Sequence, residues 1–314
     1  MYLEIGFIWK TPDKSCNVRS LLQIKYPHLL KEIDEAIDQL IRGHFLIPTD
    51  LFDKNERFSR QLLYYALSGA VSTKVHSKLK QKHVAILGCG GIGNLVSASL
   101  ATMGIGELTL VDGDFIELSN LARQLMFTEK DEGKQKVDVL KLALMERCSN
   151  LKINILNEPV TLAALEKLEK SIDLYVLSAD TVGLQDQVNL FCVQKKVPFI
   201  NIGYVQDIAV FGPFVIPGLT GCYNCRKTVA DNENISKDML EMINKINYGY
   251  QSPSIGPINM MAASYGTLDI LKYLGNFGII HSLNKRIGIW TNNFTIEQQE
   301  CSKNPNCKIC GYSG

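Results

Sequence analysis

Two basic residues, Arg123 and Lys136, follow a glycine-rich turn and two acids in an order suited to phosphate chemistry. The turn is Gly88-Cys89-Gly90-Gly91-Ile92-Gly93, and the acids are Asp112 and Asp114. Glycines let the backbone turn sharply and lie close to a phosphate, whose charge sits at a helix N-terminus. Asp112 is placed to bind ribose hydroxyls, because it ends the apolar run that follows. The set therefore predicts a nucleotide-binding site.

The glycine turn alone fits two classes of enzyme. Gly88, Gly90 and Gly93 match the dinucleotide fingerprint, and Asp112 lies at about the spacing expected for a nicotinamide cofactor. A hydride-transfer enzyme has no evident need for the basic pair beyond the ribose acid. An enzyme that splits ATP does need it, because charge builds on the phosphates as they part. The basic pair thus favours ATP chemistry over a dehydrogenase.

The elements that must position these residues alternate between strands and helices. Apolar runs predict strands at 84–87, 108–111, 153–156, 173–178 and 198–202, with helices between them. Such alternation implies a parallel sheet, whose ligand crevice lies beyond the carboxyl ends of the strands. Asp112 and Asp180 are both at such ends, so we expect them to face one crevice. Beyond these we expect antiparallel strands over 207–217, a loop over the active site at 231–257, a helix over 258–274 and a strand over 285–290.

The motifs taken together resemble a known superfamily. Gly-x-Gly-Gly-x-Gly, Asp-x-Asp, Ser-Asn-Leu-x-Arg-Gln and Gly-x-x-Lys occur in this order, as they do in E1-like (ThiF/MoeB-type) adenylating enzymes. The resemblance covers roughly Arg57 to Cys310. The stretches 86–94, 203–213 and 282–290 look especially like the peptide-antibiotic maturase branch. It implies an α/β fold with a Rossmann-like, doubly wound and mostly parallel sheet.

The resemblance also implies roles for individual residues. Asp180, in Ser178-Ala179-Asp180, matches the magnesium aspartate of the superfamily. Arg60 matches an arginine that reaches the ATP phosphates of the partner subunit, which implies a homodimer. We expect the catalytic set to be Arg60, Arg123, Lys136 and Asp180, and the nucleotide-binding set to be Gly88, Gly90, Gly91, Gly93, Asp112, Asp114, Asn120 and Gln124.

The first fifty residues read as a unit of their own. We expect a domain over 1–52, with strands near 2–9 and 45–48 and helical spacing over 21–41 that Pro27 interrupts. The adenylation domain would then occupy 53–314. One interpretation of the N-terminal unit is an extension packed on the main domain. The other, implied by the resemblance, is a small α+β clamp for a peptide, which a sheet edge can bind as an added strand.

Four of the nine cysteines form two C-x-x-C pairs, Cys222/Cys225 and Cys307/Cys310. Two such pairs predict a tetrahedral zinc site, and four sulfurs leave no open position for substrate. We therefore expect a structural zinc that pins the C-terminal segment, with a redox pair as the alternative. The remaining cysteines (Cys16, Cys89, Cys148, Cys192 and Cys301) are interpreted as small buried hydrophobic residues.

The overall charge and hydropathy of the sequence bear on its partners and its location. The formal net charge is +1 and the pI is about 7.5, which supports neither nucleic-acid binding nor electrostatic attachment to a membrane. No apolar run reaches membrane-span length and no signal peptide is evident, so we expect a cytoplasmic protein.

The motifs and the resemblance together imply an ATP- and Mg²⁺-dependent enzyme, and the resemblance implies that it adenylates a short ribosomal precursor peptide. It would either leave AMP on a terminal Asn (microcin C type) or activate Glu side chains for cyclisation (pantocin A type). The alternative is adenylation of the C-terminal Gly of a ubiquitin-like sulfur carrier, which the N-terminal unit and the lack of an evident thioester cysteine disfavour. A non-catalytic nucleotide-binding adaptor is a third hypothesis.

Overall fold

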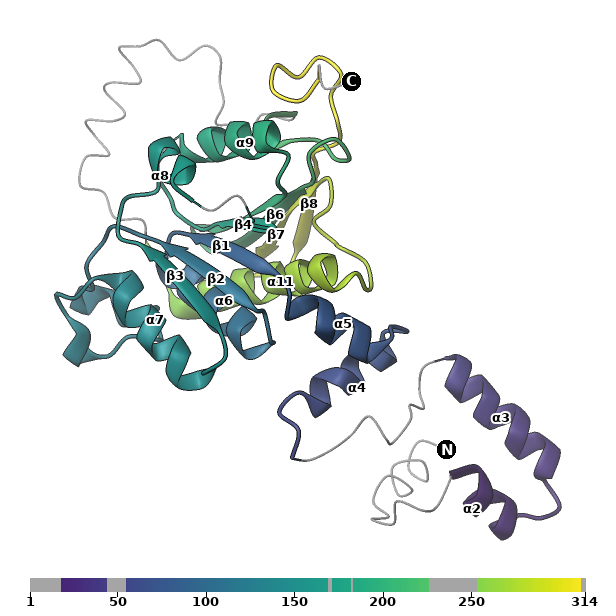
Figure 1. The fold of residues 1–314 in the computed structure, drawn as a ribbon. Coiled ribbons are helices and arrows are strands. Elements are labelled where there is room, and N and C mark those ends of the chain that lie inside the picture. Colours follow the sequence, from purple (N-terminus) through teal and green to yellow (C-terminus); the bar gives the residue numbers. More distant parts are fainter. Residues whose placement is uncertain (1–17, 44–54, 169–170, 182, 226–252, 312–314) are drawn as a thin grey trace. The chain divides into compact units, whose positions relative to one another are not determined.

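A computed structural model describes residues 18–43, 55–168, 171–181, 183–225 and 253–311. The chain divides into two compact units, Met1–His76 and Ser77–Gly314, which are described separately. The predicted boundary between residues 52 and 53 lies outside the described residues, so the division into 1–52 and 53–314 stays a prediction. Figure 1 shows the elements.

The described part of the first unit is helical, with α2 (Val18–Lys25), α3 (Leu30–Arg42), α4 (Ser59–Leu67) and the start of α5 (Ser72–Leu79). Arg19 joins the first two helices, because its Nη1 donates to Asp34 Oδ1 at 2.8 Å and its Nη2 pairs with Asp38. Pro27 lies between α2 and α3, where the sequence predicted the helical pattern to break. The strands expected near 2–9 and 45–48 lie outside the described residues.

The described part of the second unit is built on one sheet of eight strands, in the order β3-β2-β1-β4-β5-β6-β7-β8. The strands from β3 to β5 in this order pair in parallel, and the pairs from β5 to β8 are antiparallel. Their bounds are β1 His83–Leu87, β2 Glu107–Val111, β3 Lys152–Leu156, β4 Leu174–Leu177, β5 Phe199–Val205, β6 Ile208–Val215, β7 Lys285–Trp290 and β8 Ile296–Glu300.

Helices cover both faces of this sheet. Figure 1 shows α8 (Leu162–Glu166) and α9 (Leu184–Lys195) on one face, and α6 (Gly91–Thr102), α7 (Lys136–Arg147) and α11 (Gly256–Gly275) on the other. Every residue of β1 and β4 is buried, as expected for parallel strands covered on both sides. The predicted α/β fold with a doubly wound sheet is therefore confirmed.

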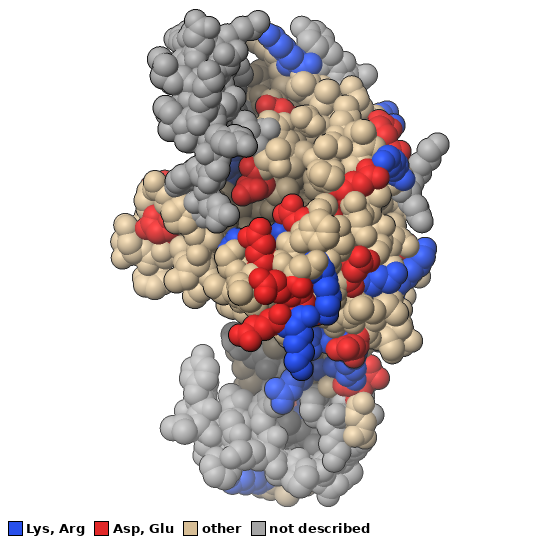
Figure 2. All heavy atoms as spheres, turned by 90° about the vertical axis from the view of Figure 1, so that its left-hand side faces the viewer, with Lys and Arg blue, Asp and Glu red and all other residues tan. Residues whose placement is uncertain are grey.

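One core cluster joins the sheet to the cysteine pairs. Leu87, Tyr175 and Phe199 on the sheet pack with Phe191 of α9, and the same cluster includes Cys222. On the face drawn in Figure 2, acidic and basic side chains are interspersed. None of the helices that the structure describes is long and apolar enough to cross a membrane.

The five predicted parallel strands, the helix α11 and the strand β7 are all present, with ends that differ by a few residues. The region 207–217 supplies one strand, β6, and its antiparallel partners are β5 and β7. Strand β8 was not predicted. Its sequence, Ile296-Glu-Gln-Gln-Glu300, is mostly exposed and polar, so it carries little of the apolar signal that marks a strand.

Candidate active site

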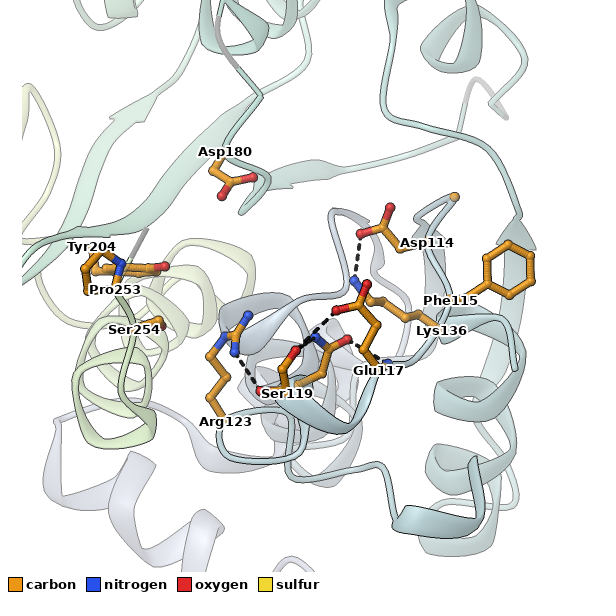
Figure 3. A pocket seen from close by; sticks show the side chains of 12 residues that line it. Asp114, Phe115, Glu117, Ser119, Arg123, Lys136, Asp180, Tyr204, Pro253 and Ser254 are labelled. Carbon is orange, nitrogen blue, oxygen red and sulfur yellow. Dashed lines mark hydrogen bonds and ion pairs between the residues drawn. The ribbon is translucent and has the colours of Figure 1, made fainter. Parts of the chain in front are cut away.

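A crevice lies where the carboxyl ends of the parallel strands meet. It includes two cavities, of about 690 and 520 Å³, and the described residues that line both are Gly113, Asp114, Arg123, Lys136, Asp180 and Tyr204. Chain order reverses between β1 and β4, and open α/β sheets bind ligands at such a switch point. The structure thus brings together three residues predicted to act together although they are far apart in the sequence: Arg123, Lys136 and Asp180 (Figure 3).

The glycine turn joins β1 to α6, and its glycines have different structural roles. Gly88 has φ +94°, which few other residues adopt. A Cβ atom on Gly93 would overlap the carbonyl oxygen of Gly88, so Gly93 permits close packing. A Cβ atom on Gly90 would meet no protein atom within 4 Å. Gly90 therefore leaves open space at the N-terminus of α6, where backbone N–H groups and the helix dipole favour an anion.

Asp112 is bonded to this turn. Its Oδ2 accepts from the backbone N–H of Cys89 at 2.6 Å, and its Oδ1 accepts from the N–H of Asp114 at 2.8 Å. Burial raises the pKa of Asp112, while Lys136 and the two N–H donors oppose that rise. The bonds fix the carboxylate beside the glycine turn, at the end of β2.

Lys136 is the first residue of α7 and is nearly buried, with 8% of its side chain exposed. Its Nζ lies 2.7 Å from Oδ2 of Asp114, whose side chain is 72% exposed. Asp114 thus holds the ammonium group of Lys136 in the crevice, and the Asp114 side chain itself is exposed to solvent (Figure 3).

The loop after β2 supplies the remaining polar residues of this wall. Asn120 is the last residue of the short helix η2 (Leu118–Asn120), and its Oδ1 accepts from the N–H of Glu117 at 3.2 Å. Arg123 Nη1 donates to the carbonyl of Ser119 at 3.0 Å. Gln124 is 2% exposed, and its Oε1 has no hydrogen-bond partner within the described part of the chain. Asn120 lines the larger cavity and Gln124 the smaller one.

Asp180 lies exposed just beyond β4 and lines both cavities. The nearby Ser178 Oγ donates to the carbonyl of Gly88 at 2.8 Å and so ties the end of β4 to the glycine turn. A carboxylate open to the crevice is the donor that Mg²⁺ prefers, so the residue present fits the metal expected there. Arg60 lies exposed on α4 in the first unit, and its role toward a partner subunit stays a prediction.

Sequence reasoning missed several residues of the crevice. Asn259 of α11 is fully buried against Gly91, and its Nδ2 donates to Ser254 Oγ at 3.1 Å. Its Oδ1 has no partner among the described residues. Tyr204 of β5 and Arg286 of β7 line the smaller cavity from the antiparallel part of the sheet. Asn259 lies outside the motifs, and Tyr204 and Arg286 lie in the stretches 203–213 and 282–290, to which the sequence assigned no individual role. The fold brings all three to the crevice.

The two C-x-x-C pairs come together as predicted, with their four sulfur atoms within 4.8 Å of one another. The Sγ atoms of Cys222 and Cys307 are 3.6 Å apart, those of Cys222 and Cys225 are 3.9 Å apart, and those of Cys225 and Cys310 are 3.3 Å apart. Tetrahedral zinc with Zn–S bonds of about 2.3 Å separates its sulfurs by about 3.8 Å. The cluster is compatible with zinc.

The cysteines outside the pairs are buried wherever the structure describes them, namely Cys89, Cys148, Cys192 and Cys301. Cys16 lies outside the described residues. Burial raises the pKa of both Cys89 and Cys192, so neither thiol is activated as a nucleophile. The interpretation of these four as small buried residues is confirmed.

Comparison with known proteins yields consistent matches. The ThiF family model matches residues 58–309. Molybdopterin-synthase adenylyltransferase of Escherichia coli (strain K12) is 28% identical over 233 residues, which are 74% of this chain and 88% of that protein.

Among solved structures, this chain is similar to E. coli MccB. The MccB complex with MccA-N7isoASN matches with a TM-score of 0.83 and 40% identity, covering 90% of this chain and 82% of that one. The MccB complex with ATP matches with a TM-score of 0.81 and 40% identity, at 90% and 82% coverage. PaaA matches with a TM-score of 0.70 at 22% identity, covering 94% of this chain and 92% of its own, which shows a shared fold.

Proposed function

Since this chain belongs to the ThiF family and is an ATP-dependent adenylating enzyme, we propose that its substrate is a short, ribosomally made precursor peptide. The observation that carries the proposal is the greater identity to MccB, a protein solved with its peptide MccA, than to the molybdopterin-synthase enzyme. The single crevice lined by Arg123, Lys136 and Asp180 supports the chemistry.

In the proposed reaction an oxygen of the peptide attacks the α-phosphorus of ATP, the bond to the bridging oxygen breaks, and pyrophosphate leaves with that electron pair. Asp112 binds the ribose, and the open space at Gly90 receives phosphate. Arg123 and Lys136 stabilise the charge that grows on the departing pyrophosphate. Asp180 would hold Mg²⁺, which supplies further charge compensation when bound.

The fate of the activated peptide divides the proposal into two forms. A microcin-type enzyme keeps AMP on a terminal Asn through nitrogen, whereas a pantocin-type enzyme activates Glu side chains and releases AMP as rings form. The alternative substrate is the C-terminal Gly of a ubiquitin-like sulfur carrier. The similarity to the molybdopterin-synthase adenylyltransferase favours that alternative. The described cysteines outside the two pairs are buried, which disfavours a thioester between one of them and a carrier protein.

The test is pyrophosphate exchange followed by mass spectrometry of the products. The full chain is incubated with ATP, Mg²⁺ and either MccA, a Glu-containing peptide or a sulfur carrier that ends in Gly-Gly. Exchange that requires a peptide supports the proposal, and retained AMP or loss of water identifies its form. Exchange with the carrier alone would replace it by the alternative, and no exchange with any of them would overturn both proposed substrate classes.

The proposed assembly follows from the same family resemblance. We expect a homodimer in which Arg60 serves the partner's ATP, an N-terminal unit that holds the peptide, a structural zinc in the cysteine cluster and a cytoplasmic location.

A further inference from the structure

The crevice has a second wall that the nucleotide motifs do not use. It is formed by the antiparallel part of the sheet, with Tyr204 and Val205 of β5, Val210 of β6 and Arg286 of β7. Tyr223, in the turn of the first cysteine pair, lines the same cavity. In Figure 3, Tyr204 lies on the side of the crevice opposite Asp114 and Lys136.

Arg286 is the basic residue of this wall. Among the described residues, three basic ones line the smaller cavity, and the other two belong to the nucleotide side. There Arg123 donates to the carbonyl of Ser119, and Lys136 pairs with Asp114. A cation on the opposite wall is in position to bind an anion that is not the triphosphate.

The guanidinium of Arg286 is held in place from two sides. Its Nη1 donates to Oε1 of Gln299 on β8 at 2.8 Å, and its Cζ lies 4.9 Å from the centre of the Tyr223 ring. Its Nη2 is buried without a hydrogen-bond partner in the part of the chain that the structure describes. A buried N–H of a charged group that lacks an acceptor is costly, so this edge of the guanidinium is suited to an incoming anion.

The geometry points to Arg286 as the residue that binds a carboxylate of the peptide substrate, an inference that rests on the proposed function. Guanidinium and carboxylate are matched in shape and charge, and their hydrogen bonds are the strong, charge-assisted kind. The carboxylate has two possible sources in the peptide, its C-terminus or a Glu side chain. In either case Arg286 fixes the acyl end of the peptide on the wall facing the nucleotide.

The test measures peptide binding without relying on turnover. Fluorescence anisotropy compares two pairs of labelled peptides, each titrated with the full chain. The first pair is MccA and its C-terminal amide, and the second is a C-terminally amidated peptide that carries either one Glu or one Gln. We expect Arg286→Gln to weaken binding of the carboxylate form by about 10- to 100-fold, and to leave the matching amide form unchanged. Arg286→Lys should restore part of the loss, because it keeps the charge but not the planar fork.

Lys285→Gln is the matched control. Lys285 is the preceding residue of β7, so its side chain points to the other face of the sheet, where its Nζ donates to Oε1 of Gln298 at 3.0 Å. The control should bind every peptide like the wild type. ATP affinity, measured by calorimetry, should change by less than about twofold in all variants, because the nucleotide wall is untouched.

The outcomes separate this inference from the proposed function. The inference is supported if the wild type prefers carboxylate peptides and Arg286→Gln loses this preference. The peptide pair that shows the preference identifies whether the carboxylate is the C-terminus or a Glu side chain. Equal binding of carboxylate and amide forms by the wild type, or equal losses in the Lys285 control, would overturn the inference. If Arg286-dependent binding is seen without pyrophosphate exchange, the proposed function fails and the carboxylate site stands.

Discussion

Gly90 and Gly93 lie three positions apart in one turn, yet a methyl group would meet different surroundings at each. At Gly93 it would overlap the Gly88 carbonyl, and at Gly90 it would enter open space. We expect Gly93→Ala to lower the free energy of unfolding by about 1–3 kcal/mol, the usual cost of overpacking. Gly90→Ala should fold normally but bind ATP at least about tenfold more weakly, because the methyl group occupies the phosphate position.

Chemical denaturation and ATP titration together check this contrast. The two substitutions are each other's control, since both add one methyl group to the same turn. If Gly90→Ala bound ATP like the wild type, the open space would not be the phosphate site.

Asp180→Asn should lower peptide-dependent pyrophosphate exchange by about 100-fold or more, since loss of one electrostatic group in an active site typically costs that much. Because Asp180 is exposed in the crevice, thermal stability should not change. Glu146→Gln, on the exposed side of α7, removes one carboxylate elsewhere and serves as the control. An Asp180→Asn enzyme with full exchange activity would remove this residue from the proposed mechanism.

At this scale the sequence could predict residues that sit in motifs and not those that the fold recruits. Arg123 and Lys136 follow the glycine turn and Asp112 in one ordered set of motifs, so their order in the chain signalled phosphate chemistry. Asn259 and Arg286 reach the crevice from α11 and β7, more than 130 residues after that turn. Their role depends on strand order and helix packing, which no local spacing encodes.

The strands that the sequence predicted best are the buried ones. Strands β1 and β4 are covered on both faces and read as unbroken apolar runs. Among the described strands, β8 pairs with β7 alone, at the sheet edge, and it is mostly polar. Hydrogen bonding to its neighbour rather than its composition therefore makes it a strand.

Helix α11 is joined to the start of β7 by a buried acid. Asp269 is 1% exposed, and its carboxylate accepts from the N–H groups of His281 at 3.0 Å and Ser282 at 2.8 Å and from the Ser282 hydroxyl at 2.6 Å. These bonds fix the segment that leads into the strand of Arg286.

We therefore expect Asp269→Ala to lower the free energy of unfolding by about 3 kcal/mol or more, because it leaves the buried N–H and hydroxyl of Ser282 without their acceptor. Urea denaturation measures the loss, with Glu297→Gln on exposed β8 as the control. A loss below about 1 kcal/mol would show that water or neighbouring groups satisfy these donors.

At the scale of the whole second unit, the cysteine cluster ties two distant parts of the chain together. Cys222 and Cys225 lie near the turn η4 (Tyr223–Cys225), and Cys307 and Cys310 lie close to the C-terminus. If the cluster holds zinc, a strong chelator should lower the melting temperature by several degrees, because metal binding contributes folding energy directly.

Cys307→Ser should lower the melting temperature similarly and lose most of its response to the chelator. Cys148→Ser, which removes a buried thiol outside the cluster, should keep the full response. Metal analysis of the purified chain should find about one zinc per chain, as four thiolates specify. A wild-type chain without metal and without a chelator response would favour the redox interpretation of the pairs.

The placement of Tyr223 has a consequence for how this enzyme could diversify. Its ring packs against the guanidinium of Arg286, and it lies between Cys222 and Cys225 in the chain. Tyr223 also packs against the core cluster that contains Cys307 and Cys310, so the cysteine cluster and the wall opposite the nucleotide are in contact. If the proposed function holds, substitutions near Cys307 and Cys310 should change which peptide binds and leave ATP binding unchanged. Peptide specificity can then change without substitutions in the residues that bind ATP.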